Sequence, residues 1–277
     1  TSLLQQLGSV ARDAAFVSAP GIDDPEDLRK LLEARHSCVL LDDAQGLTRP
    51  GIGGLALFDR VLLLARENSD KTLWVFAVDA VVWPFLRRAR DSRPLFDRIF
   101  RLAPWSEGQI ADLIRIRDKL AGIDPSFEDL LERLPPGADE IDRLEALDAK
   151  RSGYVRMIWD YASGCPAIAL EVWRSSLMEA KDGSIRVRPM DVPSSKVMEG
   201  LPDAALFILR AVMQTPEATV GDIARITRLT EDQVSNAVRF GEANGYLLRR
   251  DGVVQVPWRW LRPVLVLLER RHLLVSE

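Results

Sequence analysis

Over the first hundred residues, short apolar runs without polar alternation are separated by amphipathic stretches of about three turns. The runs predict four strands, at Ala14–Ala19, Ser37–Leu41, Thr72–Val78 and Asp97–Leu102. Helices are predicted at Thr1–Asp13, Asp24–Ala34, Leu55–Arg66 and Val82–Arg90. Strands that are apolar on both faces and alternate with helices are typical of a parallel sheet covered on both sides. The expected fold class of this part is therefore α/β.

The pattern turns helical from Ser106 onward. Ser106 is followed three residues later by Gln109, which is a capping box for a helix reaching Asp118. Further helices are predicted at Phe127–Leu134, Ile141–Leu147 and Tyr154–Ala162. The polar stretch Lys181–Lys196 is expected to be a linker or a small hairpin. We therefore expect an all-α domain over 106–180 and a linker over 181–200.

Three helices and a hairpin are predicted in the last segment, 201–277. The helices are Pro202–Gln214, Val220–Thr227 and Thr230–Asn244, and the hairpin is Tyr246–Arg250 with Val253–Val256. An Asp-Gly pair at 251–252 supplies its turn. This order predicts a winged helix, a variant of the helix-turn-helix, followed by a final helix over Pro263–Leu274.

The composition excludes several classes of protein. A net charge of −4 gives no support for non-specific binding to nucleic acid. With His36 and His272 as the only histidines, a His/Cys metal site is close to excluded. Cys38 and Cys165 are far apart and suit buried thiols in a reducing compartment. No apolar run approaches the roughly 20 residues of a membrane span, and no signal peptide is recognisable. We expect a cytoplasmic protein.

An acidic pair, Asp42–Asp43, ends the most apolar predicted strand. Parallel α/β sheets bind ligands at the carboxyl ends of their strands. There the first acid can hold Mg²⁺ and the second can orient an attacking water. From this segment alone, the alternative that the two acids merely end a strand and cap the next loop is equally open.

A family resemblance joins these segments. The start, Thr1-Ser2-Leu3-Leu4, resembles the residues after the Gly-Lys of a Walker A motif, and Leu40-Leu41-Asp42-Asp43 resembles a Walker B strand. The arrangement is similar to AAA+ ATPases of the origin-recognition type and to STAND switch ATPases, including the NB-ARC group. The resemblance implies a P-loop NTPase core over 1–105 whose Gly-rich loop precedes Thr1, a helical lid and a winged helix. It also places Thr1 and Ser2 at the nucleotide phosphates, with the Thr1 hydroxyl and Asp42 as Mg²⁺ ligands.

The resemblance assigns further residues to the nucleotide. Asp79 falls at the sensor 1 position, where the family usually has Asn or Thr, so a role as a helix cap is equally open. Arg93 matches the arginine finger, against the alternative of a solvated basic helix face. Pro166, in Gly164-Cys165-Pro166, matches the lid turn that packs on adenine, against the alternative of an ordinary helix start. The Leu-Asp-Asp form is common in the STAND branch, whereas motor-like AAA+ proteins usually carry Asp-Glu. Asp43 is one methylene shorter than that Glu, which favours a slow switch over a fast motor.

The expected function is an ATP-dependent regulatory switch that binds ATP or ADP with Mg²⁺ and hydrolyses ATP slowly. Glu231 and Asp232 open the third helix of the winged helix, which favours self-association or a protein partner over DNA. Two alternatives stay open: an origin-type ATPase whose winged helix binds duplex DNA, and a non-catalytic adaptor with a degenerate ATPase fold. Without the Gly-rich loop, the 277 residues are expected to hydrolyse ATP negligibly.

Overall fold

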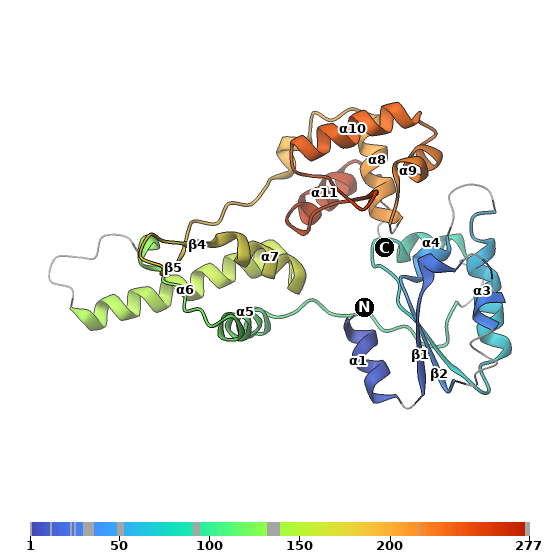
Figure 1. The fold of residues 1–277 in the computed structure, drawn as a ribbon, viewed down its shortest axis with the longest axis horizontal. Helices are drawn as coiled ribbons and strands as arrows, with labels where there is room; N and C mark the ends of the chain where they lie inside the picture. The colour runs from blue at the N-terminus through green and yellow to red at the C-terminus, as the bar shows by residue number, and fades with distance from the viewer. Residues whose placement is uncertain are drawn as a thin grey trace. The chain divides into compact units, whose positions relative to one another are not determined.

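The computed structural model describes residues 2–11, 13–22, 24, 26–29, 36–48, 53–90, 95–131, 139–215 and 217–274 (Figure 1). They form two compact units. The first comprises Thr1–Ile99, Gly200–Val256 and Leu267–Glu277, and the second comprises Phe100–Glu199 and Pro257–Val266. None of the helices in the described part of the chain combines the length and apolar character that crossing a bilayer requires.

A parallel sheet organises the first hundred residues, as predicted. Helix α1 (Ser2–Val10) precedes β1 (Ala14–Ser18), and β2 (Cys38–Asp42) lies between β1 and β3 (Leu73–Phe76). Both pairings are parallel, with Ser18 opposite Asp42 and Leu41 opposite Phe76. All five residues of β2 are buried, which explains why this strand lacks polar alternation.

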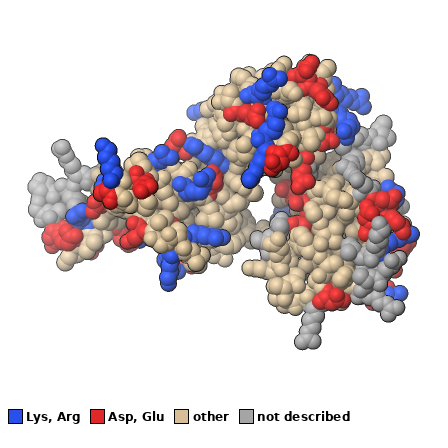
Figure 2. Space-filling view, in the orientation of Figure 1, with Lys and Arg blue, Asp and Glu red and all other residues tan. Residues whose placement is uncertain are grey.

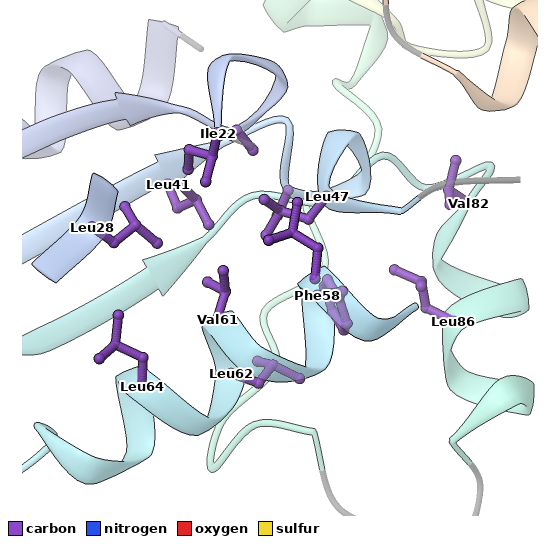
Figure 3. Packing of buried hydrophobic residues seen from close by; sticks show 13 residues of the cluster. Ile22, Leu28, Leu41, Leu47, Phe58, Val61, Leu62, Leu64, Val82 and Leu86 are labelled. Atoms are coloured by element: carbon purple, nitrogen blue, oxygen red, sulfur yellow. The ribbon is translucent and has the colours of Figure 1, made fainter. Parts of the chain in front are cut away.

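Helices cover both faces of this sheet (Figure 1). Successive residues of a strand point to opposite faces. Leu41 packs in one cluster with Phe58 and Val61 of α3 (Ala56–Glu67) and with Leu86 of α4 (Trp83–Ala89), shown in Figure 3. Its neighbour Leu40 packs in another cluster with Leu4 of α1 and Cys38. The α/β fold class is thus confirmed by the packing of β2 itself.

The predicted strand Asp97–Leu102 is wrong. These residues form no regular secondary structure, with a bend at Asp97, and pair with no strand in the described part of the chain. Ile99, Phe100 and Leu102 are 62%, 83% and 72% exposed. An apolar run becomes a strand only where a neighbour takes its backbone hydrogen bonds, and the division between the two units falls within this run, after Ile99.

The second unit is mainly helical, as predicted. Its helices are α5 (Glu107–Ala121), α6 (Glu140–Ala162) and α7 (Pro166–Ser176), and a hairpin follows at β4 (Leu177–Glu179) and β5 (Ile185–Val187). The capping box is present, since Ser106 Oγ accepts from the Gln109 amide at 3.3 Å.

Two predictions were wrong in detail. The expected helices at 141–147 and 154–162 are one continuous helix, because Gly153 does not interrupt it. A short 3-10 turn, Glu128–Leu130, replaces the predicted helix at 127–134, of which residues 132–134 lie outside the described residues.

The predicted order of three helices and a hairpin is present at the C-terminus. It consists of α8 (Asp203–Gln214), α9 (Val220–Thr227), α10 (Glu231–Ala243), β6 (Leu248–Arg250) and β7 (Val253–Gln255). Asp251 and Gly252 have positive φ of 51° and 82°, as a type I′ hairpin turn requires. The short helix α9 has the predicted bounds because Thr219 begins it with a capping box and Arg228 ends it in a left-handed conformation.

The last helix, α11 (Trp258–Arg270), begins five residues before its predicted start, with Pro263 inside it. Proline has no amide hydrogen, so the carbonyl four residues earlier, that of Arg259, loses its helical donor. The Tyr161 hydroxyl of α6 donates to this carbonyl at 2.7 Å. Burial raises the pKa of Tyr161 to about 12, against the opposing charges of Arg259 and Arg262, so the hydroxyl keeps its proton at neutral pH. A bond from α6 thus compensates for a proline in α11.

Tyr161→Phe is expected to destabilise the protein by about 1–3 kcal/mol, because it leaves a partly buried carbonyl without a donor. In a Pro263→Ala background the amide of residue 263 can bond to the Arg259 carbonyl, and the same substitution should cost markedly less. Urea unfolding of the wild type, the two single variants and the double variant measures this difference. If Tyr161→Phe lowered the free energy of unfolding equally in the wild-type and Pro263→Ala backgrounds, Tyr161 would not be replacing the missing amide.

Candidate functional site

The acidic pair lies where the sequence predicted, at the carboxyl end of the central strand. Asp42 is the last residue of β2 and is only 5% exposed. Asp43 follows in a left-handed conformation, with φ 50° and ψ 43°, and turns the chain into the 3-10 segment Ala44–Leu47. Parallel registration brings the carboxyl end of β3 to the same edge, and Asp79 follows that strand three residues after Phe76.

Gln45 connects the acidic pair to the segment after β3. Its Nε2 donates to Asp43 Oδ1 at 3.0 Å, and its Oε1 accepts from the backbone amide of Asp79, also at 3.0 Å. The side chain is buried, with 4% exposure. Sequence reasoning assigned no role to Gln45. The signal that could have found it is a polar residue two positions after the acids, in a turn otherwise made of Ala, Gly and Leu.

Asp79 lies close enough to Asp43 for their charges to interact. Desolvation raises the pKa of Asp79, although the residue as a whole is exposed, and the Asp43 charge acts in the same direction. A hydrogen bond from the Val81 amide at 2.7 Å opposes the shift. Asp79 also accepts the Val82 and Trp83 amides through its backbone carbonyl. It orders the turn into α4, whereas the N-cap of that helix is Val82.

The acidic pair fits Mg²⁺ of the kind that accompanies a nucleotide. Within the described ranges, no group of three or more His, Cys, Asp or Glu side chains could hold a metal ion. Mg²⁺ usually keeps several waters and uses one or two carboxylates together with substrate phosphates. Asp42 supplies one such carboxylate at the strand end and could hold Mg²⁺ together with phosphate oxygens, and Asp43 supplies a second acid beside it.

For the other predicted site residues, the structure gives at most the element or unit to which each belongs. Thr1 and Arg93 lie outside the described residues. Ser2 is the first residue of α1. Pro166 is the first residue of α7 and belongs to the second unit, where it follows Gly164, a glycine with a φ of +72°.

Few arginines near the hairpin are free for phosphate. Arg249 pairs with Glu242 at 3.5 Å, and Arg250, whose side chain is 80% exposed, lies 3.9 Å from Asp251 Oδ2. Arg259 donates to Asp191 Oδ2 at 2.8 Å, and Arg262 donates to the Tyr161 carbonyl at 2.6 Å. Acidic and basic side chains are interspersed over the C-terminal helices on the face seen in Figure 2. The arrangement does not favour a strongly basic surface.

No protein-family profile matches the chain, and no curated protein matches it. Among solved structures, it is similar to Cdc6p from Pyrobaculum aerophilum, with 14% identity, a TM-score of 0.32, and coverage of 97% of this chain and 84% of that one. It is also similar to the replication initiator DnaA bound to AMPPCP and single-stranded DNA, with 14% identity, a TM-score of 0.29, and coverage of 96% and 80%. A Walker-type ATPase of Pyrococcus abyssi matches with 14% identity, a TM-score of 0.31, and coverage of 83% and 62%. Similarity of this degree carries no argument for function, which must come from the chain's own residues.

Proposed function

We propose that the chain is the greater part of a P-loop ATPase of the AAA+/STAND kind that acts as a slow ATP-dependent switch. The observation that carries the proposal is the pair of carboxylates at the carboxyl end of the central strand of a parallel sheet. In this proposal Asp42 holds Mg²⁺ with the nucleotide phosphates. Asp43, the more accessible acid, orients the attacking water.

The proposal assigns residues 1–105 to the ATPase core, 106–180 to the lid, 181–200 to a linker and 201–277 to the winged helix. Thr1, Ser2, Asp79, Arg93 and Pro166 keep their proposed places around the nucleotide. The bonds from α11 support a coupling of the segment after the hairpin to the lid and the linker. Within the second unit, Arg262 binds the Tyr161 carbonyl of the proposed lid and Arg259 binds Asp191 of the proposed linker. Nucleotide state would then change the position or assembly of the winged helix, with self-association or a protein partner as the output.

DNA binding by the winged helix is less well supported. Of the arginines that could contact phosphate, Arg259 and Arg262 are engaged by Asp191 and by backbone carbonyls. The first turn of α10 carries Glu231 and Asp232, which a DNA groove would repel. A duplex affinity that falls steeply with salt would favour the origin-type alternative over a protein-directed switch.

The test uses a longer form of the protein that includes the Gly-rich loop proposed to precede Thr1. We expect this longer protein to bind ATP and ADP in the presence of Mg²⁺, with an affinity that EDTA reduces, measured by calorimetry or with a fluorescent nucleotide. The 277 residues alone should bind nucleotide much more weakly, because half of the proposed phosphate site is missing. A longer protein with no affinity for either nucleotide would rule out the switch and leave the non-catalytic adaptor.

A further inference from the structure

We infer that Gln45 is a positioning residue that couples the turn after β3 to the orientation of the Asp43 carboxylate. The inference rests on the proposed function for its catalytic consequence, whereas the linkage itself stands on the geometry. Gln45 touches no reacting atom in this scheme. It acts by holding Asp43, the acid proposed to orient the attacking water.

The orientation of the Gln45 amide is determined by its neighbours. The backbone amide of Asp79 can only donate, so the atom that faces it must be Oε1. The remaining Nε2 then faces Asp43 Oδ1, an acceptor, and both contacts measure 3.0 Å. The bond to an ionised carboxylate is the stronger kind. One buried side chain thus joins two segments that are 34 residues apart in the chain.

The backbone beneath Gln45 is held in place. The Ala44 amide donates to the Ala77 carbonyl at 2.8 Å, and the Gly46 amide donates to the Asp43 carbonyl at 2.7 Å. A Cβ on Gly46 would lie 2.9 Å from the Pro20 side chain, so the turn is tightly packed at this point. The Thr48 backbone amide donates to the Gln45 carbonyl at 3.0 Å. Since the backbone is fixed, a shift of the Asp79 amide is transmitted through the side chain of Gln45.

The turn that contains Asp79 leads directly into α4. The Asp79 carbonyl accepts the amides of Val82 and Trp83, at 3.1 and 2.9 Å, so the turn and the start of the helix move together. A displacement of this turn would pull on Gln45 Oε1 and change the hydrogen bond that Nε2 makes with Asp43. The coupling therefore regulates the step that uses Asp43, which is hydrolysis, more than the binding of nucleotide.

Two substitutions separate the two contacts of Gln45. Gln45→Glu keeps an oxygen for the Asp79 amide but places a second anionic oxygen against Asp43. Gln45→Met keeps the length and removes both contacts. Thr48→Ala is the matched control, because it removes a hydrogen bond of the same turn without touching Asp43 or Asp79. Urea unfolding of each variant establishes that it folds.

The linkage is tested first in the 277-residue chain by NMR, without nucleotide. Asp43→Ala should shift the side-chain amide signals of Gln45, and hydrogen exchange of the Asp79 amide should quicken in Gln45→Met but not in Gln45→Glu or Thr48→Ala. The linkage would be overturned if Asp43→Ala left the side-chain amide signals of Gln45 unshifted. It would also be overturned if the Asp79 amide exchanged its hydrogen at the same rate in Gln45→Met as in the wild type. These readouts do not depend on ATP, so they distinguish failure of the linkage from failure of the proposed function.

The consequence is tested in the longer protein by ATPase kinetics. Gln45→Glu should lower kcat about tenfold or more while KM changes by less than about twofold, the pattern expected when an orienting contact is lost. Thr48→Ala should keep both constants near those of the wild type. A kcat of Gln45→Glu equal to that of Thr48→Ala would show that Gln45 does not position Asp43 for hydrolysis.

Discussion

Asp43→Asn in the longer protein is expected to reduce ATP hydrolysis by roughly 100-fold or more, the range lost when a general base is removed. Nucleotide affinity should change little, because the amide is nearly isosteric and its oxygen can still accept from Gln45 Nε2. The left-handed backbone at this position is also retained, since Asn adopts it as readily as Asp. Single-turnover hydrolysis and nucleotide titrations on the same preparation give both quantities.

Asp42→Ala serves as the comparison, because the two adjacent acids have different proposed roles. Losing a Mg²⁺ ligand should weaken the Mg²⁺-dependent part of nucleotide binding, whereas affinity measured in EDTA should match that of the wild type. Hydrolysis is lost as a result of weaker metal binding. If Asp43→Asn weakened binding and Asp42→Ala left it intact, the two roles would have to be exchanged. If neither affected binding or hydrolysis, the acids would only end the strand.

Gly164→Ala is expected to destabilise the protein by several kcal/mol, within the range of the most damaging single substitutions. Gly164 has a φ of +72°, which alanine adopts only with strain. The added Cβ would also lie 2.6 Å from the Trp105 carbonyl oxygen and 2.7 Å from the Pro104 side chain. The backbone cannot easily give way, since the Trp105 amide donates to the Gly164 carbonyl at 2.9 Å.

Gly153→Ala provides the matched control in the same unit. Gly153 lies within α6 and has no atom within 4 Å of the position of an added Cβ. Alanine there should stabilise the protein by about 0.5–1 kcal/mol, because it favours the helix. Chemical unfolding monitored by circular dichroism compares the two variants with the wild type. A Gly164→Ala variant as stable as Gly153→Ala would mean that the turn before α7 is not packed as described.

The regular elements were predictable wherever local signals were strong. The buried strand β2, the capping boxes at Ser106 and Thr219 and the Asp-Gly hairpin turn are all specified by neighbouring residues. The strand predicted at Asp97–Leu102 was wrong because the apolar pattern of these residues does not show whether a partner strand is present. Pro263 was misread as a helix start because the compensating hydroxyl, that of Tyr161, lies about a hundred residues away in the sequence.

The candidate site likewise has some features that neighbouring residues specify and others that depend on residues distant in the sequence. The acidic pair was found because both acids follow one apolar strand. The hydrogen bond that the Asp79 amide donates to Gln45 Oε1 could not be predicted, because it depends on the register between β2 and β3. The roles of all the proposed site residues stay predictions, and Thr1 and Arg93 also lie outside the described residues.

The left-handed conformation of Asp43 limits how this site could change by mutation. Aspartate and asparagine are among the few residues other than glycine that adopt this conformation readily, because their short side chains bond to nearby groups. A glutamate at 43 would extend the acid by one methylene but would lose this preference. The short acid is thus set partly by the path of the backbone. Under the proposed function, faster hydrolysis would require a reshaped turn as well as a longer side chain.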